Sequence, residues 1–488
     1  MMSTRPASLP VRLLLAGVLP VCLAVGCGEE KNPADDTGPG DTEPEDTGGE
    51  DTGGEDSPCE LPDGVLPVEG ADVTIVGDPG DEFGWPAAGI GDVNGDGYDD
   101  VWASTWEYGG SPGIWFGPLE GGLGGLDDDT PDVVIDGWAA SAGDLNADGL
   151  GDLVSVSRGD ETYGAFLVYG PLSGGETYSY DVADAWIFTT QDRSRPTDRC
   201  SFGHGADEFH GVLLGAGGDF TSGDWAGAVY GFVGAVEGEM PLTDASFLLL
   251  GEEGDTAGDA LAGPGDIDGD GVTDLAVGAP SALSEDGSWP GAAYVISGPV
   301  SGTLSLADAD AKLLGDVDGA AAGYSMAATG DIDGDGSADL LVGALSSSES
   351  TGSWDGIVYV VLGSVQGVHS LAEAEIQIQG GNGGDSLGMV VAGQGDYDGD
   401  GTPDLALSYT LVPYCYQSAL IYFAPAPGVY GAEDADVTIA SSEVLEGVAL
   451  AGDVNGDDLD DLLIGSPGYG QDDHGDLFLW YGRGDWGL

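Results

Sequence analysis

The 488-residue sequence predicts an all-β fold, a seven-bladed β-propeller, and three observations lead to this prediction. An aspartate-rich segment of nine residues recurs along the chain at intervals of 47 to 75 residues. Short apolar runs, rich in Val, Ile, Leu and aromatic residues and bounded by Gly, Pro and Asp, flank each copy as strands would. No stretch shows a sustained helical period. Because one repeat cannot bury both faces of its own sheet, we expect the sheets to pack radially.

The first 63 residues differ from the repeats, which occupy residues 64–488. Residues 1–26 have the features of a secretory signal peptide, with a basic start, an apolar stretch and a small-residue cleavage site. Residues 27–63 are acidic and nearly free of aliphatic and aromatic side chains. Such a segment cannot bury enough surface to offset its ordering entropy, so we expect a disordered tether.

The end of the signal segment, Leu23 to Cys27, resembles a bacterial lipobox. That resemblance implies that Cys27 is lipidated and that the protein is exported to the cell surface or outer membrane as a lipoprotein. It also implies that the protein contacts the membrane through this anchor only. Ordinary cleavage, which would give a freely secreted product, is the alternative.

The charge of the chain is strongly negative, with 9 Lys and Arg against 88 Asp and Glu and a formal net charge of −79. Nucleic acid is therefore excluded as a natural partner, because binding to phosphates needs basic side chains. The carboxylates must either ligate metal ions or solvate the surface. Six divalent ions would cancel only a small part of the charge, so we expect both roles.

The recurring segment has the pattern D-x-[DN]-x-D-G-x-x-D in six copies, the last with aspartate in place of the glycine. Side-chain oxygens at positions 1, 3 and 5, the backbone carbonyl at position 7 and a carboxylate at position 9 favour Ca²⁺ over Zn²⁺. We therefore predict about six calcium sites. Their ligands are Asp92, Asn94, Asp96, Tyr98 and Asp100; Asp144, Asn146, Asp148, Leu150 and Asp152; Asp266, Asp268, Asp270, Val272 and Asp274; Asp331, Asp333, Asp335, Ser337 and Asp339; Asp396, Asp398, Asp400, Thr402 and Asp404; and Asp453, Asn455, Asp457, Leu459 and Asp461.

Two other interpretations of these loops are weaker. An EF-hand needs a glutamate at position 12, where three copies carry Val277, Val342 and Leu407. A metal-free acidic turn would leave clustered carboxylates repelling one another. A degenerate seventh copy begins at Asp219, and we expect it to bind metal weakly or not at all. Asp458 replaces the glycine of the last copy.

The motifs around these loops resemble a known repeat. Phe83-Gly84 precedes the first loop, and Gly278-Ala279-Pro280 follows the loop that starts at Asp266. The combination resembles the FG-GAP repeat of integrin-α β-propellers over residues 64–488. The resemblance implies that loops on one face bind a protein or carbohydrate ligand. The order of the apolar runs further predicts that Ala71–Val76 forms the outermost strand of the last blade.

The leading functional interpretation is a monomeric cell-surface binding or adhesion module, stabilised by calcium and not an enzyme. The alternatives are a secreted hydrolase or lyase that uses the propeller as a catalytic scaffold, and a purely structural envelope protein. The pairing of Cys59, Cys200 and Cys415 is left open by the sequence.

Three further features were considered. The insertion from Cys200 to His210 fits no standard zinc spacing and is interpreted as a variable loop. Arg483-Gly484-Asp485 forms an RGD tripeptide, which we interpret as coincidence. Tryptophans in or near blade loops either form a recognition surface or pack between blades. They are Trp85, Trp102, Trp106, Trp115, Trp138, Trp225, Trp289 and Trp354.

Overall fold

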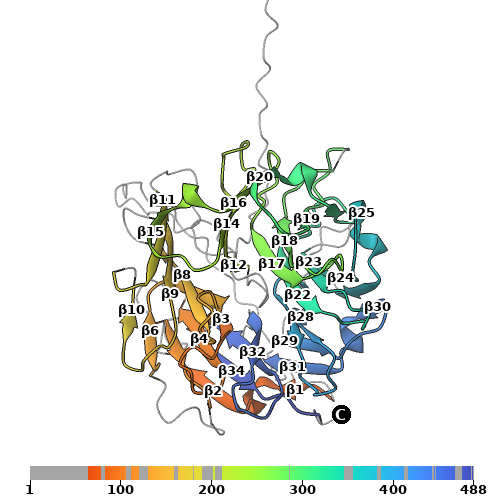
Figure 1. Ribbon diagram of the computed structural model, residues 1–488. Helices are drawn as coiled ribbons and strands as arrows, with labels where there is room; N and C mark the ends of the chain where they lie inside the picture. Colours follow the sequence, from red (N-terminus) through yellow and green to blue (C-terminus); the bar gives the residue numbers. More distant parts are fainter. Residues whose placement is uncertain are drawn as a thin grey trace, which may run out of the picture. The chain divides into compact units, whose positions relative to one another are not determined.

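The chain folds as a ring of seven β-sheets in a computed structural model (Figure 1). The described part of the chain contains 34 strands and five 3₁₀ turns. In that part, no helix is long and apolar enough to cross a membrane. The described residues are 64–77, 83–105, 112–119, 130–158, 163–179, 181–189, 202–203, 211–284, 286–345, 355–381, 386–411, 416–441, 445, 447–467, 475–484 and 486.

Each sheet is one blade, and the strands below are given from the first strand to the outer edge. Blade 1 contains β3 (Phe83–Gly91), β4 (Asp100–Thr105), β5 (Gly113–Trp115), β6 (Val133–Ile135) and β10 (Thr177–Tyr178). Blade 2 contains β7 (Trp138–Gly143), β8 (Asp152–Arg158), β9 (Tyr163–Val168), β11 (Ala185–Thr189) and β15 (Gly238–Pro241). Blade 3 contains β12 (Phe202–Gly203), β13 (Gly211–Ala216), β14 (Ala228–Val233), β16 (Phe247–Leu250) and β20 (Gly302–Ser305).

The remaining four blades repeat this arrangement. Blade 4 contains β17 (Ala260–Gly265), β18 (Asp274–Ala279), β19 (Ala292–Ile296), β21 (Ala311–Leu314) and β25 (Gly367–Ser370). Blade 5 contains β22 (Ser325–Gly330), β23 (Asp339–Ala344), β24 (Ile357–Val361), β26 (Ile376–Gln379) and β30 (Gly428–Gly431). Blade 6 contains β27 (Val391–Gly395), β28 (Asp404–Leu411), β29 (Tyr416–Tyr422), β31 (Val437–Ser441) and β1 (Leu66–Pro67). Blade 7 contains β32 (Gly447–Gly452), β33 (Asp461–Ser466), β34 (Asp476–Trp480) and β2 (Val73–Val76).

The first four strands of a blade pair antiparallel, and a fifth strand pairs parallel to the fourth in blades 1 to 6. In blades 1 to 5 this fifth strand comes from the next repeat along the chain, so each of these repeats adds a strand to the sheet of the repeat before it. In blade 6 the fifth strand is the N-terminal β1. In five cases a 3₁₀ turn follows it. These turns are η1 (Val68–Gly70), η2 (Leu242–Asp244), η3 (Leu306–Asp308), η4 (Leu371–Glu373) and η5 (Ala432–Asp434).

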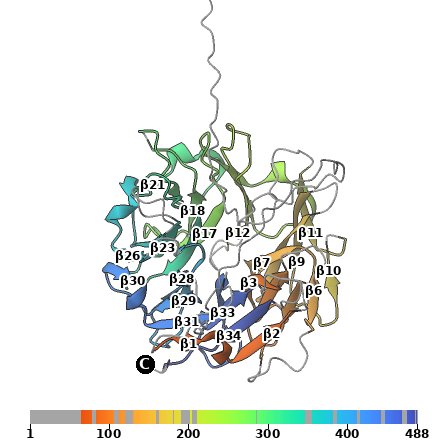
Figure 2. The same cartoon turned by 180° about the vertical axis from the view of Figure 1, so that it is seen from behind.

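The N-terminal repeat segment closes the ring, which confirms the predicted position of Ala71–Val76. Strand β2 pairs antiparallel with β34 and completes blade 7. The preceding β1 adds to blade 6 by pairing parallel with β31 (Figure 2). Arg483 forms an ion pair with Asp72 beside this junction. Arg483 therefore contributes to the closure of the ring.

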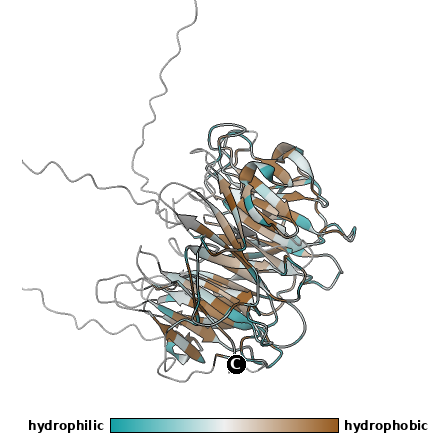
Figure 3. Ribbon diagram, turned by 60° about the vertical axis from the view of Figure 1, so that its left-hand side comes forward, coloured by the Kyte–Doolittle hydropathy of each residue, from teal (hydrophilic) through white to brown (hydrophobic). Residues whose placement is uncertain are grey.

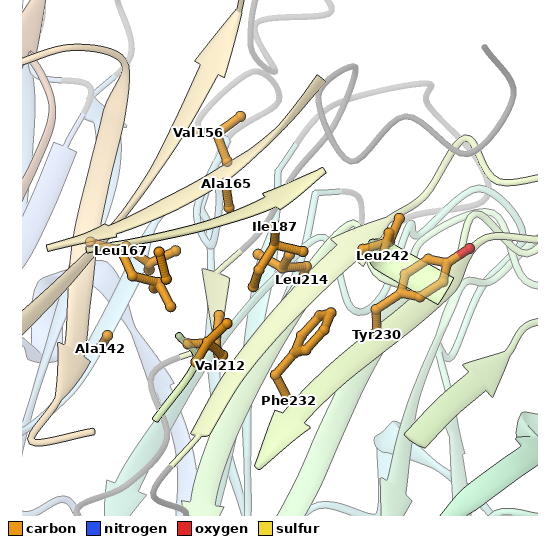
Figure 4. Close-up of a cluster of buried hydrophobic side chains, with 14 of the residues drawn as sticks. Ala142, Val156, Ala165, Leu167, Ile187, Val212, Leu214, Tyr230, Phe232 and Leu242 are labelled. Atoms are coloured by element: carbon orange, nitrogen blue, oxygen red, sulfur yellow. The ribbon is translucent and has the colours of Figure 1, made fainter. Parts of the chain in front are cut away.

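The hydrophobic core consists of seven clusters, one between each pair of successive blades, and includes the pair formed by blades 7 and 1. Apolar residues are concentrated along the strands (Figure 3). Central strands such as β18 are buried throughout, whereas an outer strand such as β21 alternates buried and half-buried residues. Between blades 2 and 3, for example, Leu167 and Ile187 face Leu214 and Phe232 (Figure 4). A closed set of interfaces leaves no blade without a partner.

Candidate metal centre

The six intact aspartate loops occupy one equivalent place in the fold. Each loop connects the first and second strands of its blade, as Asp266 to Asp274 connects β17 and β18. Because the strands are antiparallel, all six loops lie at the same end of their sheets. They occur in every blade except blade 3. In each loop the structure brings the predicted side chains of positions 1, 3, 5 and 9 into one short turn.

Hydrogen bonds within each loop aim the carboxylates inward. In the loop at Asp266, the Asp266 Oδ2 accepts the backbone N–H of Gly271 at 2.7 Å. The Asp268 Oδ1 accepts the N–H of Asp270 at 3.1 Å, and the Asp270 Oδ1 accepts that of Val272 at 2.8 Å. Gly271 has φ of 86°, a conformation that favours glycine. The Asp266 Oδ1 also accepts the N–H groups of Gly269 and Asp270, at 2.7 and 3.0 Å, whereas these bonds do not use the second oxygens of Asp268 and Asp270.

The loop at Asp453 keeps this geometry without the glycine. Asp458 has φ of 68°, and its N–H donates to the Asp453 Oδ2 at 2.9 Å. Aspartate tolerates the left-handed region better than most residues, because its short polar side chain can hydrogen-bond locally. Asn455 differs from the other position 3 residues, because its amide nitrogen donates to the Asp461 Oδ1 at 3.4 Å.

The position 9 aspartates are fully buried and join three strands. Asp274 has 0% exposure, and its Oδ2 accepts the N–H of Ile267 at 2.9 Å. Its Oδ1 accepts the N–H of Gly298, which follows the third strand, at 2.8 Å. The same two bonds recur at the other five positions, which are Asp100, Asp152, Asp339, Asp404 and Asp461. The sequence predicted only metal ligation here and missed this structural role.

In three loops the carboxylates of positions 1, 3 and 9 lie close enough to share one cation. Oxygens from all three residues lie within 4.8 Å of one another, in the groups Asp266, Asp268 and Asp274; Asp331, Asp333 and Asp339; and Asp396, Asp398 and Asp404. Position 5 lies outside these groups. The Asp331 Oδ1 is buried and has no hydrogen-bond partner among the described residues. A divalent cation would satisfy this oxygen, so the donor set fits calcium.

Electrostatics at position 9 also fit a cation. Burial raises the pKa of the Asp100, Asp404 and Asp461 carboxyls to about 7, and neighbouring loop carboxylates add to the effect. Burial likewise raises the pKa of Asp152 and Asp339 to about 6. Burial removes these groups from water, and hydrogen bonds from backbone N–H groups offset only part of the cost. A bound divalent ion would hold them in the charged form.

The loops also connect neighbouring blades. The backbone N–H at position 8 donates to the position 1 carbonyl of the preceding loop, as in Ala338 to Asp266 at 2.8 Å and Gly151 to Asp92 at 2.8 Å. The same link joins blade 1 to blade 7 through Asp99 and Asp453, at 3.1 Å. Position 8 is proline only at Pro403, which has no N–H to donate. A metal ion in one loop would therefore support the interface with the next blade.

At two of these links, the aspartate at position 8 adds a second hydrogen bond through its side chain. The Asp460 Oδ2 accepts the N–H of Asp396 at 2.9 Å, and the Asp99 Oδ2 accepts that of Asp453 at 2.8 Å. Burial raises the pKa of both Asp99 and Asp460, and nearby carboxylates contribute to the increase. The sequence pattern gave no sign of these contacts, because position 8 varies among glycine, alanine, aspartate, threonine and proline.

The assignment of a seventh loop at Asp219 is wrong. Residues 217–227 connect β13 and β14, the second and third strands of blade 3, and so lie at the opposite end of the sheet. Strand β13, which begins at Gly211, is the strand that leads directly into Asp219. Asp219 is buried and accepts a hydrogen bond from the Tyr230 hydroxyl at 2.8 Å. The stretch between β12 and β13 corresponds to the aspartate loop, and it lies outside the described residues.

Other residues singled out from the sequence fall in different places. Trp102 and Trp115 are buried between blades, whereas Trp225 and Trp289 are exposed by 56% and 64%. The Trp138 side chain is half-buried. Within the insertion from Cys200 to His210, Phe202 and Gly203 form β12, the first strand of blade 3. The remaining predictions fall on positions or side chains outside the described ones, namely Cys27, Cys59, Cys200, Cys415, residues 204–210, Trp85, Trp106 and Trp354.

Taken together, the fold and the loops define a class of protein, a seven-bladed β-propeller with aspartate-rich turns between its first and second strands. The family model "FG-GAP repeat" matches residues 257–296 and 322–361, which lie in blades 4 and 5. Blades 4 and 5 thus contain FG-GAP repeats, and the resemblance to integrin-α propellers is confirmed.

Curated relatives match parts of the chain. Mouse integrin alpha-7 is 35% identical over 156 residues, 30% of this chain and 12% of that protein. Integrin alpha pat-2 of Caenorhabditis briggsae is 40% identical over 87 residues, 17% of this chain and 7% of that protein. Human phosphatidylinositol-glycan-specific phospholipase D is 32% identical over 157 residues, 30% of this chain and 18% of that protein. The matched part spans less than a fifth of each of these relatives.

Proposed function

We propose that the chain is a calcium-stabilised binding module that is displayed outside the cell and recognises a protein or glycan ligand through propeller loops. The observation that carries this proposal is that the two ends of the sheets carry different kinds of loop. The aspartate loops at one end are hydrogen-bonded to one another across the blade interfaces. The loops at the other end include exposed aromatic side chains, as an interaction surface does.

Calcium has a structural role in this proposal. In each of the six loops, the side chains of positions 1, 3, 5 and 9 and the carbonyl of position 7 would hold the ion. The ion would neutralise buried carboxylates and fix the turn between the first two strands. Since the turn also contacts the next blade, calcium would stabilise the ring rather than act on a substrate.

The similarity to integrin alpha chains supports a binding function, because the resemblance to integrin-α propellers implies a ligand bound by loops on one face. The match to a phospholipase D supports a second candidate, a hydrolase that uses the propeller as a scaffold. The two differ in a measurable way, since a binding module has no turnover. A purely structural envelope protein would bind no ligand at all.

We further propose that the N-terminal segment exports and anchors the module as a monomer. Cys27 would carry the lipid, and residues 28–63 would act as a spacer whose negative charges keep it extended. Expression in a lipoprotein-processing bacterium with labelled palmitate tests this directly. Label should enter the wild type and not a Cys27→Ala variant, and equal labelling of both would disprove the anchor.

The binding function is tested by applying the calcium-loaded full chain to glycan and peptide arrays. The same preparation is assayed for hydrolysis of glycan and phospholipid substrates. The proposal predicts specific array binding without turnover, and loss of binding when a chelator removes calcium. Turnover by the folded protein would favour the hydrolase, and absence of any binding would favour the structural role.

A further inference from the structure

A hollow lies between blades 3 and 4, at the end of the sheets opposite the aspartate loops. Its volume is about 410 Å³, within the range of small-ligand sites. One wall is the connection between β13 and β14 and carries Trp225; the other connects β18 and β19 and carries Leu283 and Trp289. Its base includes Thr256, in the connection between β16 and β17. Residues 217–227, which contain the Asp219 loop that the sequence predicted to bind metal weakly or not at all, therefore form one wall of this hollow.

The walls expose large apolar side chains that the fold holds in place. Trp225, Trp289 and Leu283 are exposed by 56%, 64% and 40%. The Trp225 carbonyl accepts the N–H of Thr256 at 2.9 Å, and the Phe220 ring lies 5.2 Å from the Trp225 ring. The N–H of Trp289 donates to the Asp318 Oδ1 at 2.6 Å. Rigid, exposed aromatic residues at a concave site are typical of ligand recognition.

The base of the hollow offers a polar group that lacks a partner. Thr256 is 8% exposed, and its Oγ1 is buried with no hydrogen-bond partner among the described residues. The backbone of Thr256 has a φ of 53°, in the left-handed region that β-branched residues rarely adopt. Trp225 also has a φ of 53°, which is uncommon for a bulky residue. A buried hydroxyl without a partner is costly, so a ligand hydroxyl at this point would gain a hydrogen bond.

The charges around the hollow restrict the chemistry of its ligand. None of the described residues that line it carries a charged side chain, so it offers no counter-ion to a cationic group. The net charge of −79 would repel an anionic ligand. The complementary ligand is neutral, with an apolar face for the tryptophans and hydroxyls for Thr256. A pyranose ring has both, since its C–H groups form flat faces and its hydroxyls form a rim.

We propose that this hollow binds a neutral carbohydrate, with a sugar ring against Trp225 or Trp289 and a sugar hydroxyl at the Thr256 Oγ1. This inference rests on the proposed binding function and names the ligand class and the site. Trp225 and Trp289 each stand two residues before a glycine in successive blades, so the two aromatic side chains come from equivalent positions on the two walls. Two aromatic faces favour an oligosaccharide over a single sugar.

The test titrates the calcium-loaded full chain with neutral hexasaccharides of glucose, mannose, xylose and N-acetylglucosamine, using tryptophan fluorescence and calorimetry. At least one of them should bind. Trp225→Ala and Trp289→Ala should each weaken that affinity about tenfold or more, which corresponds to the loss of one aromatic anchor. Thr256→Val should weaken it severalfold, because it keeps the shape and removes the hydroxyl.

Val368→Ala is the matched control, since Val368 is 69% exposed on β25, outside the lining of the hollow. It should leave glycan affinity unchanged. Thermal melting in calcium identifies any variant that fails to fold, and Trp225→Phe and Trp289→Phe then replace the alanine variants. These retain an aromatic face and should bind with an affinity between those of the wild type and the alanine variants.

Three outcomes would overturn the inference. If a glycan binds equally well to the wild type and to both folded tryptophan variants, the hollow is not the site, although the binding function stands. If no neutral glycan binds but the chain binds peptides on an array, the function stands and the ligand class is wrong. If neither glycans nor peptides bind, the inference and the proposed function fail together.

Discussion

At the residue scale, the position 9 aspartate does more than the loop pattern predicts. Asp274 is buried and accepts hydrogen bonds from Ile267 and Gly298, so it joins the loop to the third strand even before a cation is considered. Asp270, at position 5 of the same loop, is exposed and accepts only a local bond from Val272. Asp274 therefore has a structural role that Asp270 lacks.

We predict that Asp274→Ala destabilises the metal-free protein by about 2–4 kcal/mol, because two buried N–H groups lose their acceptor. Asp270→Ala should change metal-free stability by no more than about 0.5 kcal/mol. In calcium, both variants should be less stable than the wild type. Chemical denaturation with and without a chelator measures these differences, and equal metal-free stability of the two variants would contradict the assigned role of position 9.

The buried carboxylates also predict a pH dependence that changes sign with calcium. Burial raises the pKa of Asp100, Asp404 and Asp461 to about 7 in the folded state, above the ordinary value of 3.8. Without metal, the folded protein then binds more protons than the unfolded chain between these values. Metal-free stability should therefore decrease as the pH rises from 5 to about 8.

With calcium present the trend should reverse, because protons and calcium compete for the same oxygens. Acidification from about pH 8 to about pH 5 should then lower the melting temperature. Differential scanning calorimetry of dialysed and calcium-loaded samples shows both trends. Parallel pH profiles in the two samples would mean that these carboxylates do not bind the ion.

At the element scale, the loops act as links between blades. The Asp460 Oδ2 accepts the N–H of Asp396 across the interface between blades 6 and 7. We predict that Asp460→Ala is less stable than Asp460→Asn by about 1 kcal/mol, because asparagine keeps the acceptor while both variants remove the charge. Denaturation in calcium measures the difference. Identical stabilities would show that this bond contributes nothing to the interface.

The sequence predicted most of these elements and missed those without side-chain signals. Runs such as β18 and β24 are apolar, and the aspartate loops are nearly invariant, so both were found. The parallel fifth strands were missed because β20 and β25 are largely exposed and show no apolar alternation. The links at position 8 use backbone N–H groups, which no residue pattern records.

The error at Asp219 has a similar physical cause. An aspartate followed by glycines fits a degenerate loop by composition, and only strand pairing reveals that β13 precedes it as the second strand of the blade. The pairing of β12 with β13 is short, at Phe202 and Gly203, and the sequence offers no apolar run there. Sequence distance alone could not detect this shift of one strand.

At the scale of the whole molecule, closure depends on a short N-terminal strand. In β2 the side chains of Val73 and Ile75 are buried against blades 7 and 1, whereas Thr74 faces the other side and is half-buried. The order of the apolar runs predicted this strand correctly. The additional pairing of β1 with blade 6 was not predicted, because two residues give no periodic signal.

We predict that Ile75→Ala destabilises the ring by about 2–4 kcal/mol, through lost burial and the cavity that remains. Thr74→Ala should cost no more than about 0.5 kcal/mol. Equilibrium unfolding compares the two. If both variants lose equally little stability, the ring tolerates an open interface between blades 7 and 1, which would contradict the closed arrangement.

Calorimetric titration of the metal-free chain with calcium, followed by thermal melting, tests the central claim most directly. The account predicts about six bound ions per chain and a melting temperature that rises strongly with calcium concentration, because folded loops bind the ion and unfolded ones do not. Zinc should not substitute for calcium. A chain that binds no calcium, or whose melting temperature does not change with calcium concentration, would contradict the account.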